Sequence, residues 1–276
     1  MNFRFTIILF LISFFSCGKK DIDLSKIENL NGNKITVFGH AGMGIASQFP
    51  INTFESISSA LASGAGGVEV DIQMTKDSVL VLFHNRILEE QTNLEGLISE
   101  REWSYVHEAT YLDPIFSEYK IISLDQLFSN LEDVKKYHFS FDLEFHEAEH
   151  PDSYISTYVN ALIKVIEKHD MDENVFIESQ RTRYLEKIQM LRPDLNLFYW
   201  ENSPAGIQIA INMNLFGFII QTDYITAEQI KEAHDAGIRV SLFGLQSKEE
   251  NLDAVEKSPD FLQTDKVNYL VNVLKK

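Results

Sequence analysis

The sequence predicts an α/β protein, a (β/α)8 TIM-like barrel with a small insertion after the second strand. Eight short β-rich segments recur along the chain, and each is followed by a helical pattern. The length of 276 residues fits one such barrel, which typically needs about 250 residues. Hydrophobic residues make up 45% of the chain, which excludes a disordered protein. A doubly wound sheet is the alternative architecture.

The candidate strands are short runs of β-branched, aromatic and other apolar residues bounded by polar or glycine-containing turns. They are Ile35–His40, Val68–Met74, Phe139–Phe145, Val175–Glu178, Leu195–Trp200, Phe218–Gln221, Val240–Phe243 and Phe261–Gln263.

Several of the intervening helices carry recognisable start or stop signals. One is expected to begin after Thr53 and to end at Gly64. Ser123 and Thr226 are each followed three residues later by Gln, the pattern of a capping box. Gly237 is expected to end the helix that Thr226 begins.

The alternation is interrupted after the second strand. Val79–Asn85 reads as an extra strand, and residues 86–120 are mixed in character and include Trp103, Tyr105 and Tyr111. This segment is an insertion between the second strand and its helix. In barrels such insertions lie on the C-terminal face, over the active site.

The N-terminus has the proportions of a signal peptide over residues 1–16. Arg4 precedes the apolar run Phe5–Phe15, which is too short to cross a membrane as a helix, since that needs about 20 residues. Cys17 follows directly, as in bacterial lipoprotein signals, where the cysteine is acylated and becomes the new N-terminus. Phe14 departs from the leucine usual at its position. We expect lipidation at Cys17 and a location in the cell envelope, on a bacterial membrane, facing the periplasm or the surface. An ordinary secretory signal is the alternative.

Residues 17–33 are polar and are expected to tether residues 34–276, the barrel domain, to the lipid. The chain holds 24 Lys and Arg against 41 Asp and Glu, a net charge of −17. Removal of residues 1–16 takes away Arg4 and no acid, which gives −17 − 1 = −18. Such a charge argues against nucleic acid as a partner and is compatible with a divalent cation. The single cysteine excludes an intrachain disulfide.

Two acidic residues lie inside an apolar strand. Alternation places Glu69 and Asp71 on one face, and Val68, Val70 and Ile72 on the other. Two carboxylates on one side of a buried strand repel each other and are costly to desolvate, and a bound cation relieves both costs. An exposed strand face is the alternative interpretation.

The third strand repeats this pattern, because Asp142, Glu144 and His146 share one face. A carboxylate-rich ligand set favours Mg²⁺ or Ca²⁺ over Zn²⁺ or Cu²⁺. His40 ends the first strand and His84 ends the extra one. Two histidines near a hard cation indicate an acid and a base that flank a phosphoester.

These residues together resemble the glycerophosphodiester phosphodiesterase family. Its pattern has His-Arg-Gly, Glu-Asn-Thr, Gly-Ala-Asp-x-x-Glu-x-Asp-Val-x-x-Thr-Lys-Asp, a His-Asp pair and a later Glu-x-Lys. This chain carries GHAG, PINTFES, GAGGVEVDIQMTKDSVLVLFHN, DLEFH, AHDAGIRVSLF and DFLQTD. The resemblance covers residues 35–276.

The resemblance implies a metal-dependent phosphodiesterase on a (β/α)8 barrel. By it, Glu69, Asp71 and Glu144 match the ligands of one Mg²⁺ or Ca²⁺ ion, and His40 and His84 match the acid/base pair. The implied reaction cleaves a small glycerophosphodiester-like molecule to an alcohol and a phosphomonoester.

Four positions depart from the family pattern. Ala41 replaces its Arg, Ile51 its Glu, Asn85 its Asp and His146 its Lys. Asn85 and His146 are therefore expected to bind substrate and to alter its choice. Two alternatives remain: an inactive ligand-binding lipoprotein, and a sphingomyelinase-D-like phospholipase with the aromatic residues of the insertion at its mouth.

Overall fold

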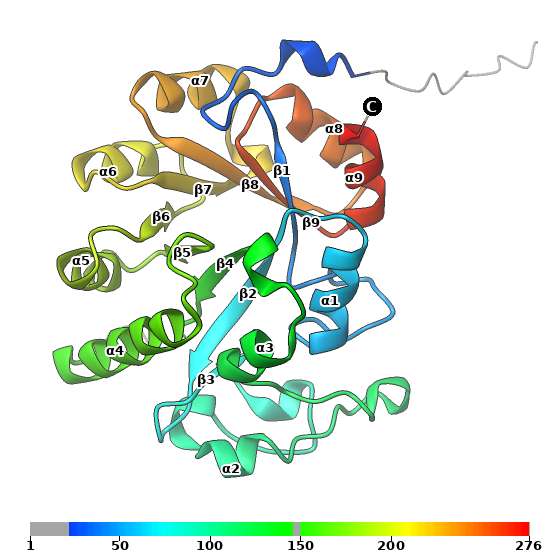
Figure 1. Ribbon diagram of the computed structural model, residues 1–276, viewed down its shortest axis with the longest axis vertical. Helices are drawn as coiled ribbons and strands as arrows, with labels where there is room; N and C mark the ends of the chain where they lie inside the picture. Colours follow the sequence, from blue (N-terminus) through cyan, green and yellow to red (C-terminus); the bar gives the residue numbers. More distant parts are fainter. Residues whose placement is uncertain (1–21, 146–149, 276) are drawn as a thin grey trace, which may run out of the picture.

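The computed structural model describes residues 22–145 and 150–275, and within them the chain forms the predicted barrel (Figure 1). Eight parallel strands form a closed sheet, which closes where β1 (Thr36–Gly39) pairs with both β2 (Gly67–Met74) and β9 (Phe261–Thr264). The remaining barrel strands are β4 (His138–Leu143), β5 (Val175–Ser179), β6 (Asn196–Trp200), β7 (Gly217–Gln221) and β8 (Arg239–Leu245). The eight predicted strands are confirmed, with ends that differ by no more than two residues.

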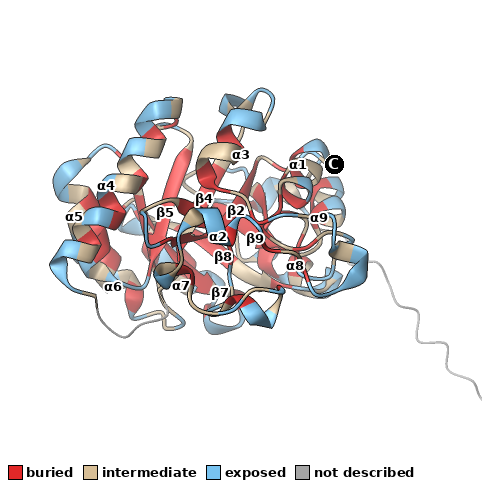
Figure 2. Ribbon diagram, turned by 90° about the horizontal axis from the view of Figure 1, so that it is seen from below, coloured by how far each residue is buried: buried red, intermediate tan, exposed pale blue. Residues whose placement is uncertain are grey.

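One α-helix follows each barrel strand and packs outside it (Figure 1). Figure 2 shows the buried residues at the centre and the exposed ones on the outer helix faces. The helices are α1 (Phe54–Ala62), α3 (Leu124–Asn130), α4 (Asp152–His169), α5 (Thr182–Leu191), α6 (Gly206–Asn212), α7 (Ala227–Asp235), α8 (Lys248–Glu256) and α9 (Val267–Leu274).

The predicted helix signals are present. The Thr53 hydroxyl accepts from the backbone N–H of Ser56, and capping boxes begin α3 at Ser123 and α7 at Thr226. Gly237 follows the C-cap residue of α7, Ala236, and has φ +81°, a conformation that residues with a side chain adopt at a cost.

The insertion lies between β2 and α3. Its strand β3 (Leu80–Leu82) is antiparallel to β2 and shorter than the predicted Val79–Asn85. The short helix α2 (Trp103–Val106) follows. The insertion has its own apolar cluster, formed by Val81, Phe83, Leu88, Ile98, Val106, Ala109 and Ile121. Single 3-10 turns occupy Leu24–Lys26, Leu88–Glu90, Ile98–Glu100, Pro114–Phe116, Val134–Lys136 and Thr222–Tyr224.

The barrel interior is apolar at the N-terminal ends of the strands and polar at their C-terminal ends. The apolar layer is a cluster of buried side chains, Phe38, Phe176, Phe198, Ile219 and Phe261. Side chains two positions apart on a strand point the same way. The next inward residues on β1, β5, β6 and β9 are therefore His40, Glu178, Trp200 and Gln263.

The segment before β1 packs across the N-terminal end of the barrel. Ile27 is buried, the Asn29 side chain donates to the carbonyl of Pro259 (2.8 Å), and Arg239 donates to the carbonyl of Leu30 (3.4 Å). The expected tether of residues 17–33 therefore does not extend to residue 33: Ile22 already packs on the core, because its apolar side chain finds partners there.

Cys17 lies outside the described residues. Within the described part of the chain, none of the helices combines the length and apolar character needed to span a bilayer.

Candidate functional site

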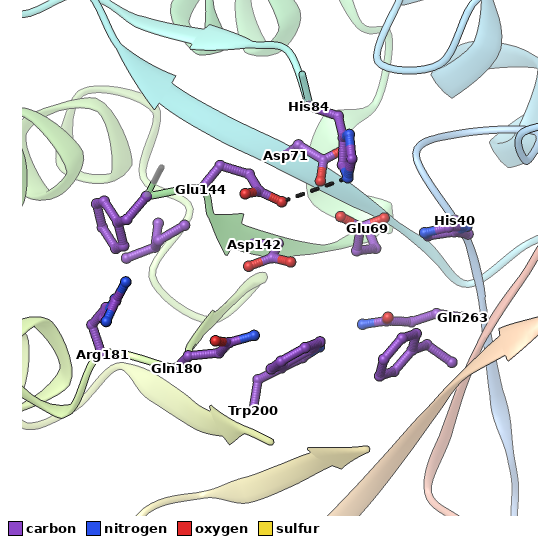
Figure 3. Close-up of a pocket in the computed structure, with 13 residues that line it drawn as sticks. His40, Glu69, Asp71, His84, Asp142, Glu144, Gln180, Arg181, Trp200 and Gln263 are labelled. Carbon is purple, nitrogen blue, oxygen red and sulfur yellow. Dashed lines mark ion pairs between the residues drawn. The ribbon is translucent and has the colours of Figure 1, made fainter. Parts of the chain in front are cut away.

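A cavity of about 310 Å³ opens at the C-terminal ends of the barrel strands, and we call it the catalytic pocket (Figure 3). Six residues singled out in the sequence meet there, although they come from four strands and their following loops. The residues that line it are His40, Glu69, Asp71, His84, Asp142, Leu143, Glu144, Phe145, Gln180, Arg181, Trp200, Phe243 and Gln263.

Glu69 and Asp71 are fixed by hydrogen bonds from the loop after β1. The backbone N–H of Ala41 donates to Glu69 Oε2 (2.8 Å). Asn52 Nδ2 donates to Asp71 Oδ2 (2.6 Å), and Asn52 Oδ1 accepts from the Asp71 backbone N–H (3.0 Å). Asn52 has φ +62°, which asparagine tolerates better than most residues. Glu69 and Asp71 are 3% and 4% exposed, so the exposed-face alternative is wrong.

Two overlapping groups of ligand atoms share Asp71. Oxygens of Glu69, Asp71 and Asp142 lie within 4.8 Å of one another, and so do ligand atoms of Asp71, His84 and Glu144. The predicted ligands Glu69, Asp71 and Glu144 are thus divided between the two groups. Asp142, which the sequence placed on the same face as Glu144, joins them.

The crowded carboxylates bind protons more tightly than usual. Burial, and then the negative charge of Asp71, raise the pKa of Glu69 well above its ordinary value. Burial, the charge of Asp71 and a hydrogen bond with Asp71 raise the pKa of Glu144 to about 8. The pKa of Asp142 is raised by burial and by Glu178. A bound cation would relieve this repulsion, so the donor set fits a hard divalent ion.

His40 is oriented by Asp265, which directly follows β9. His40 Nδ1 lies 2.8 Å from Asp265 Oδ1, which also accepts from the backbone N–H of Ile45 (3.2 Å). An ionised carboxylate only accepts, so Nδ1 carries the proton and leaves Nε2 available for proton transfer. Burial lowers the pKa of His40, but the Asp265 hydrogen bond and nearby negative charges outweigh it and raise the pKa. A Cβ on Gly44 would lie 2.4 Å from the Asp265 Cα, so this approach requires glycine.

His84 is more open to solvent than His40. Its side chain is 55% exposed, against 28% for His40, and its Nε2 lies 3.8 Å from Glu144 Oε1. Figure 3 shows His84 beside Asp71 and His40 on the β1 side of Glu69. The two rings therefore approach the same carboxylates from different strands.

Asn85, one of the two residues predicted to bind substrate, does not line the catalytic pocket. The Asn85 side chain instead donates to Glu90 Oε2 (2.6 Å), in the insertion. His146 lies outside the described residues.

The sequence reasoning missed four lining residues: Gln180 and Arg181 after β5, Trp200 at the end of β6, and Phe243 within β8. Arg181 is an exposed cation at the rim. Trp200 and Phe243 stack with centroids 5.5 Å apart and form one wall. Strand alternation was the available signal, since Trp200 follows the inward Phe198 by two positions.

Comparison with known proteins supports the family resemblance seen in the sequence. The model of the "Glycerophosphoryl diester phosphodiesterase family" matches residues 43–269. A glycerophosphodiester phosphodiesterase of Caldanaerobacter subterraneus is 23% identical over 88% of this chain and 99% of its own length. One from Bacillus altitudinis is 27% identical over 58% of this chain and 64% of its own.

Solved structures show the same fold. An Oleispira antarctica phosphodiesterase in complex with the product sn-glycerol-3-phosphate has a TM-score of 0.77 at 18% identity, and the match covers 87% of this chain and 97% of that one. A Parabacteroides distasonis glycerophosphodiester phosphodiesterase has a TM-score of 0.74 at 16% identity, over 88% and 97%. The chain therefore belongs to the glycerophosphoryl diester phosphodiesterase family and is a phosphoric diester hydrolase.

Proposed function

We propose that this protein hydrolyses a small glycerophosphodiester to an alcohol and a phosphomonoester, with one Mg²⁺ or Ca²⁺ ion and the His40/His84 pair. The observation that carries the proposal is the convergence on one pocket of the buried carboxylates of β2, the half-buried Asp142 and Glu144, and both histidines. Relatives named glycerophosphodiester phosphodiesterases, and a neighbour solved with sn-glycerol-3-phosphate, support the substrate class.

Glu69, Asp71 and Glu144 would hold the cation, with Asp142 close enough to contribute an oxygen. When bound, the ion supplies positive charge that stabilises the developing phosphoryl oxyanion and orients the phosphate. Asn52 and the Ala41 backbone N–H hold the two β2 carboxylates in place.

The two histidines move the protons. One ring takes the proton of the attacking hydroxyl, and the other gives a proton to the leaving alkoxide. Asp265 fixes the His40 tautomer, so Nε2 is the atom that exchanges the proton. Because Ala41 has no charged side chain, we assign electrostatic recognition of the phosphate to Arg181 at the rim of the pocket.

We also propose that Cys17 is acylated and holds the domain on a bacterial membrane. Support comes from the sequence, where the apolar run of residues 5–15 is followed within two positions by the only cysteine. Cys17→Ser should move the protein from the membrane fraction to the soluble fraction. If both forms fractionate alike, the lipid anchor is wrong.

The enzymatic proposal is tested with the mature protein and a panel of glycerophosphocholine, glycerophosphoethanolamine and glycerophosphoglycerol. Release of alcohol and phosphomonoester should require Mg²⁺ or Ca²⁺ and should stop with EDTA. Glu69→Gln should lose turnover, while Glu186→Gln, on the outer helix α5, should not. A folded protein that binds the cation and turns over none of the panel would be a binding barrel instead.

A further inference from the structure

Glu178 is a buried acidic residue that takes no part in the proposed reaction. It lies in β5 and is 1% exposed, and it does not itself line the catalytic pocket. Its hydrogen-bond partner does, since Gln263, in β9, is 4% exposed and is one of the lining residues. The pair therefore links a buried carboxylate to the wall of the pocket.

The carboxylate of Glu178 determines which way the Gln263 amide is turned. Gln263 Nε2 donates to Glu178 Oε1 (3.0 Å) and lies 3.3 Å from Glu178 Oε2. An ionised carboxylate only accepts hydrogen bonds, so the amide NH2 group faces Glu178 and the amide carbonyl oxygen, Oε1, faces away from it. Gln263 therefore presents an acceptor whose orientation is fixed from below.

The Gln263 carbonyl oxygen is open to the catalytic pocket. In the part of the chain that the structure describes, it accepts no hydrogen bond, and the fully buried side-chain atoms that lack a partner belong to Tyr111, His138 and Asp260 instead. Figure 3 shows the amide end of Gln263 directed into the pocket. An acceptor in this position is satisfied by water or by a donor of the bound ligand.

An aromatic wall accompanies this acceptor. Trp200 and Phe243 line the same pocket, and Phe243 lies on β8, which pairs with the strand of Gln263. Aromatic faces beside an amide acceptor fit a polyol, because its C–H groups pack on the rings while its hydroxyls form hydrogen bonds. The proposed cation ligands come instead from β2 and β4, so the phosphate and the polyol are bound by different strands.

We propose that Gln263 Oε1 accepts a hydrogen bond from the terminal hydroxyl of the glycerol part of the substrate, and that Glu178 is the positioning residue that keeps this oxygen turned towards the substrate. This inference rests on the proposed function and names a residue that determines its specificity. The middle hydroxyl of glycerol lies beside the ester oxygen, close to the groups that act on the phosphate. The terminal hydroxyl is one carbon further from phosphorus and can reach β9.

The test compares kcat/KM for glycerophosphocholine with kcat/KM for 2-hydroxypropyl phosphocholine, in which a methyl group replaces the terminal hydroxymethyl group. Assays are run at pH 8, above the pKa of about 7 to which burial raises Glu178. The parent should prefer glycerophosphocholine by at least about tenfold, since the analogue leaves the Gln263 oxygen unpaired. Gln263→Met, close in size and without the amide, should reduce the preference to within about twofold. Both values come from one enzyme, so a general loss of active protein cancels from the ratio.

Gln189→Met is the matched control. Gln189 is a half-buried glutamine on the outer helix α5, its Nε2 donates to the Met213 carbonyl (3.0 Å), and its replacement should leave the preference unchanged.

Glu178→Gln tests the positioning role, because an amide there can donate to Gln263 Oε1 and turn it away from the substrate. The preference should fall, while the melting temperature without metal should hold or rise because a buried charge is removed. A lower melting temperature with the full preference would mean that Glu178 only supports the fold.

Each outcome decides the role of Gln263. A preference that survives Gln263→Met, or a parent enzyme with none, overturns this role and leaves the proposed function standing. If neither compound is hydrolysed, the proposed function fails, and calorimetric titration with sn-glycerol-3-phosphate and with 2-hydroxypropyl phosphate decides. A higher affinity for sn-glycerol-3-phosphate that Gln263→Met removes supports the contact, whereas equal affinities, or no binding of either compound, overturn it.

Discussion

The two ends of the barrel interior are built from the same strands and have opposite characters. At the N-terminal end, phenylalanine rings pack against one another, with Phe38 and Phe261 centroids 5.7 Å apart. Two residues further along, β1 presents His40 and β5 presents Glu178, which is 1% exposed. The interior therefore changes from aromatic to polar side chains over only two residues of each strand.

The difference shows that one end of the sheet stabilises the fold, whereas the other end carries the polar groups of the pocket. The aromatic end gains free energy from burial and dispersion. At the other end, burial raises the pKa of Glu178 to about 7, and the neighbouring carboxylates repel it. Repulsion among buried carboxylates destabilises the fold, so the aromatic layer must offset it until a cation binds.

The largest expected effect comes from Asp71→Asn, since Asp71 belongs to both groups of ligand atoms. Loss of a residue that only hydrogen-bonds to a metal ligand lowers metal affinity by about 10–100-fold. Loss of Asp71 itself should lower metal affinity by more than this, and turnover should stop. Without metal the variant should unfold at an equal or higher temperature, because one repelling charge is gone. Calorimetry with Mg²⁺ measures both effects, and Asp235→Asn on α7 is the control. Unchanged Mg²⁺ binding would contradict the shared site.

The next effect is on catalysis alone. His40→Ala should lower kcat by about 10²–10⁴-fold with metal affinity intact, because a proton-transfer group is lost. Single-turnover kinetics checks this, with His107→Ala in the insertion as an exposed control. Asp265→Asn should lower kcat by less and change the acid limb of the pH profile. A His40→Ala enzyme with full kcat on every substrate would remove the acid/base role.

A substitution at the aromatic end should affect stability and leave metal binding and catalysis unchanged. Phe198→Ala should cost about 3–5 kcal/mol of unfolding free energy, because the ring is 1% exposed and packs on Phe176 and Phe216. Metal affinity and kcat of the folded fraction should change little. Urea unfolding with and without Mg²⁺ measures the loss, and Met190→Ala should fall within about 0.5 kcal/mol of the parent. A loss of metal affinity equal to that of Asp71→Asn would show that the two ends are not separable.

A separate prediction concerns the pH dependence of stability without metal. Glu144 and Glu178 have folded pKa values of about 8 and about 7, above the ordinary 4.5, so the folded state holds the extra protons. The contribution of these two groups to the stability of the metal-free protein should therefore be greatest below pH 4.5. It should fall as the pH rises towards 8. The melting temperature in EDTA should therefore fall between pH 5 and pH 8, by roughly 2–4 °C for each kcal/mol lost in a chain of this size.

Added Mg²⁺ should stabilise the protein more at pH 8 than at pH 5, because at low pH it competes with protons. The loss of unfolding free energy caused by Phe198→Ala should be the same at pH 5 and pH 8. A metal-free melting temperature that rises from pH 5 to 8 would contradict the raised pKa values.

The fold was predictable because strand and helix periods are local. The eight strands follow from apolar runs and their spacing, and Glu69 and Asp71 stood out as charges within one such run. The second half of the expected tether was misread because its apolar side chains, such as Ile22 and Ile27, are isolated in a polar stretch. Isolated apolar residues form no periodic sequence pattern, and the surface on which they pack exists only in the folded barrel.

The side chains that meet in the pocket were largely predictable from the sequence, and the contacts that hold them in place were less so. Asp265 is 225 residues from His40, and no local pattern joins positions so far apart. Asn52 was visible as part of a motif, but its bond to Asp71 depends on a left-handed backbone that spacing does not reveal. Arg181 follows β5 and Trp200 ends β6, and the inward face of each strand is defined only once the barrel is closed.

If Cys17 is acylated as proposed, the segment that covers the N-terminal end of the barrel would set the orientation of the enzyme on the membrane. Ile22 is already packed on the core, so only five residue steps separate it from a lipid at Cys17, about 17 Å when fully extended. Acylation would therefore hold the aromatic end of the barrel against the bilayer and turn the pocket towards the aqueous compartment. Lipids packed in the anchoring membrane would lie behind the enzyme, and its substrates would arrive as single molecules from solution.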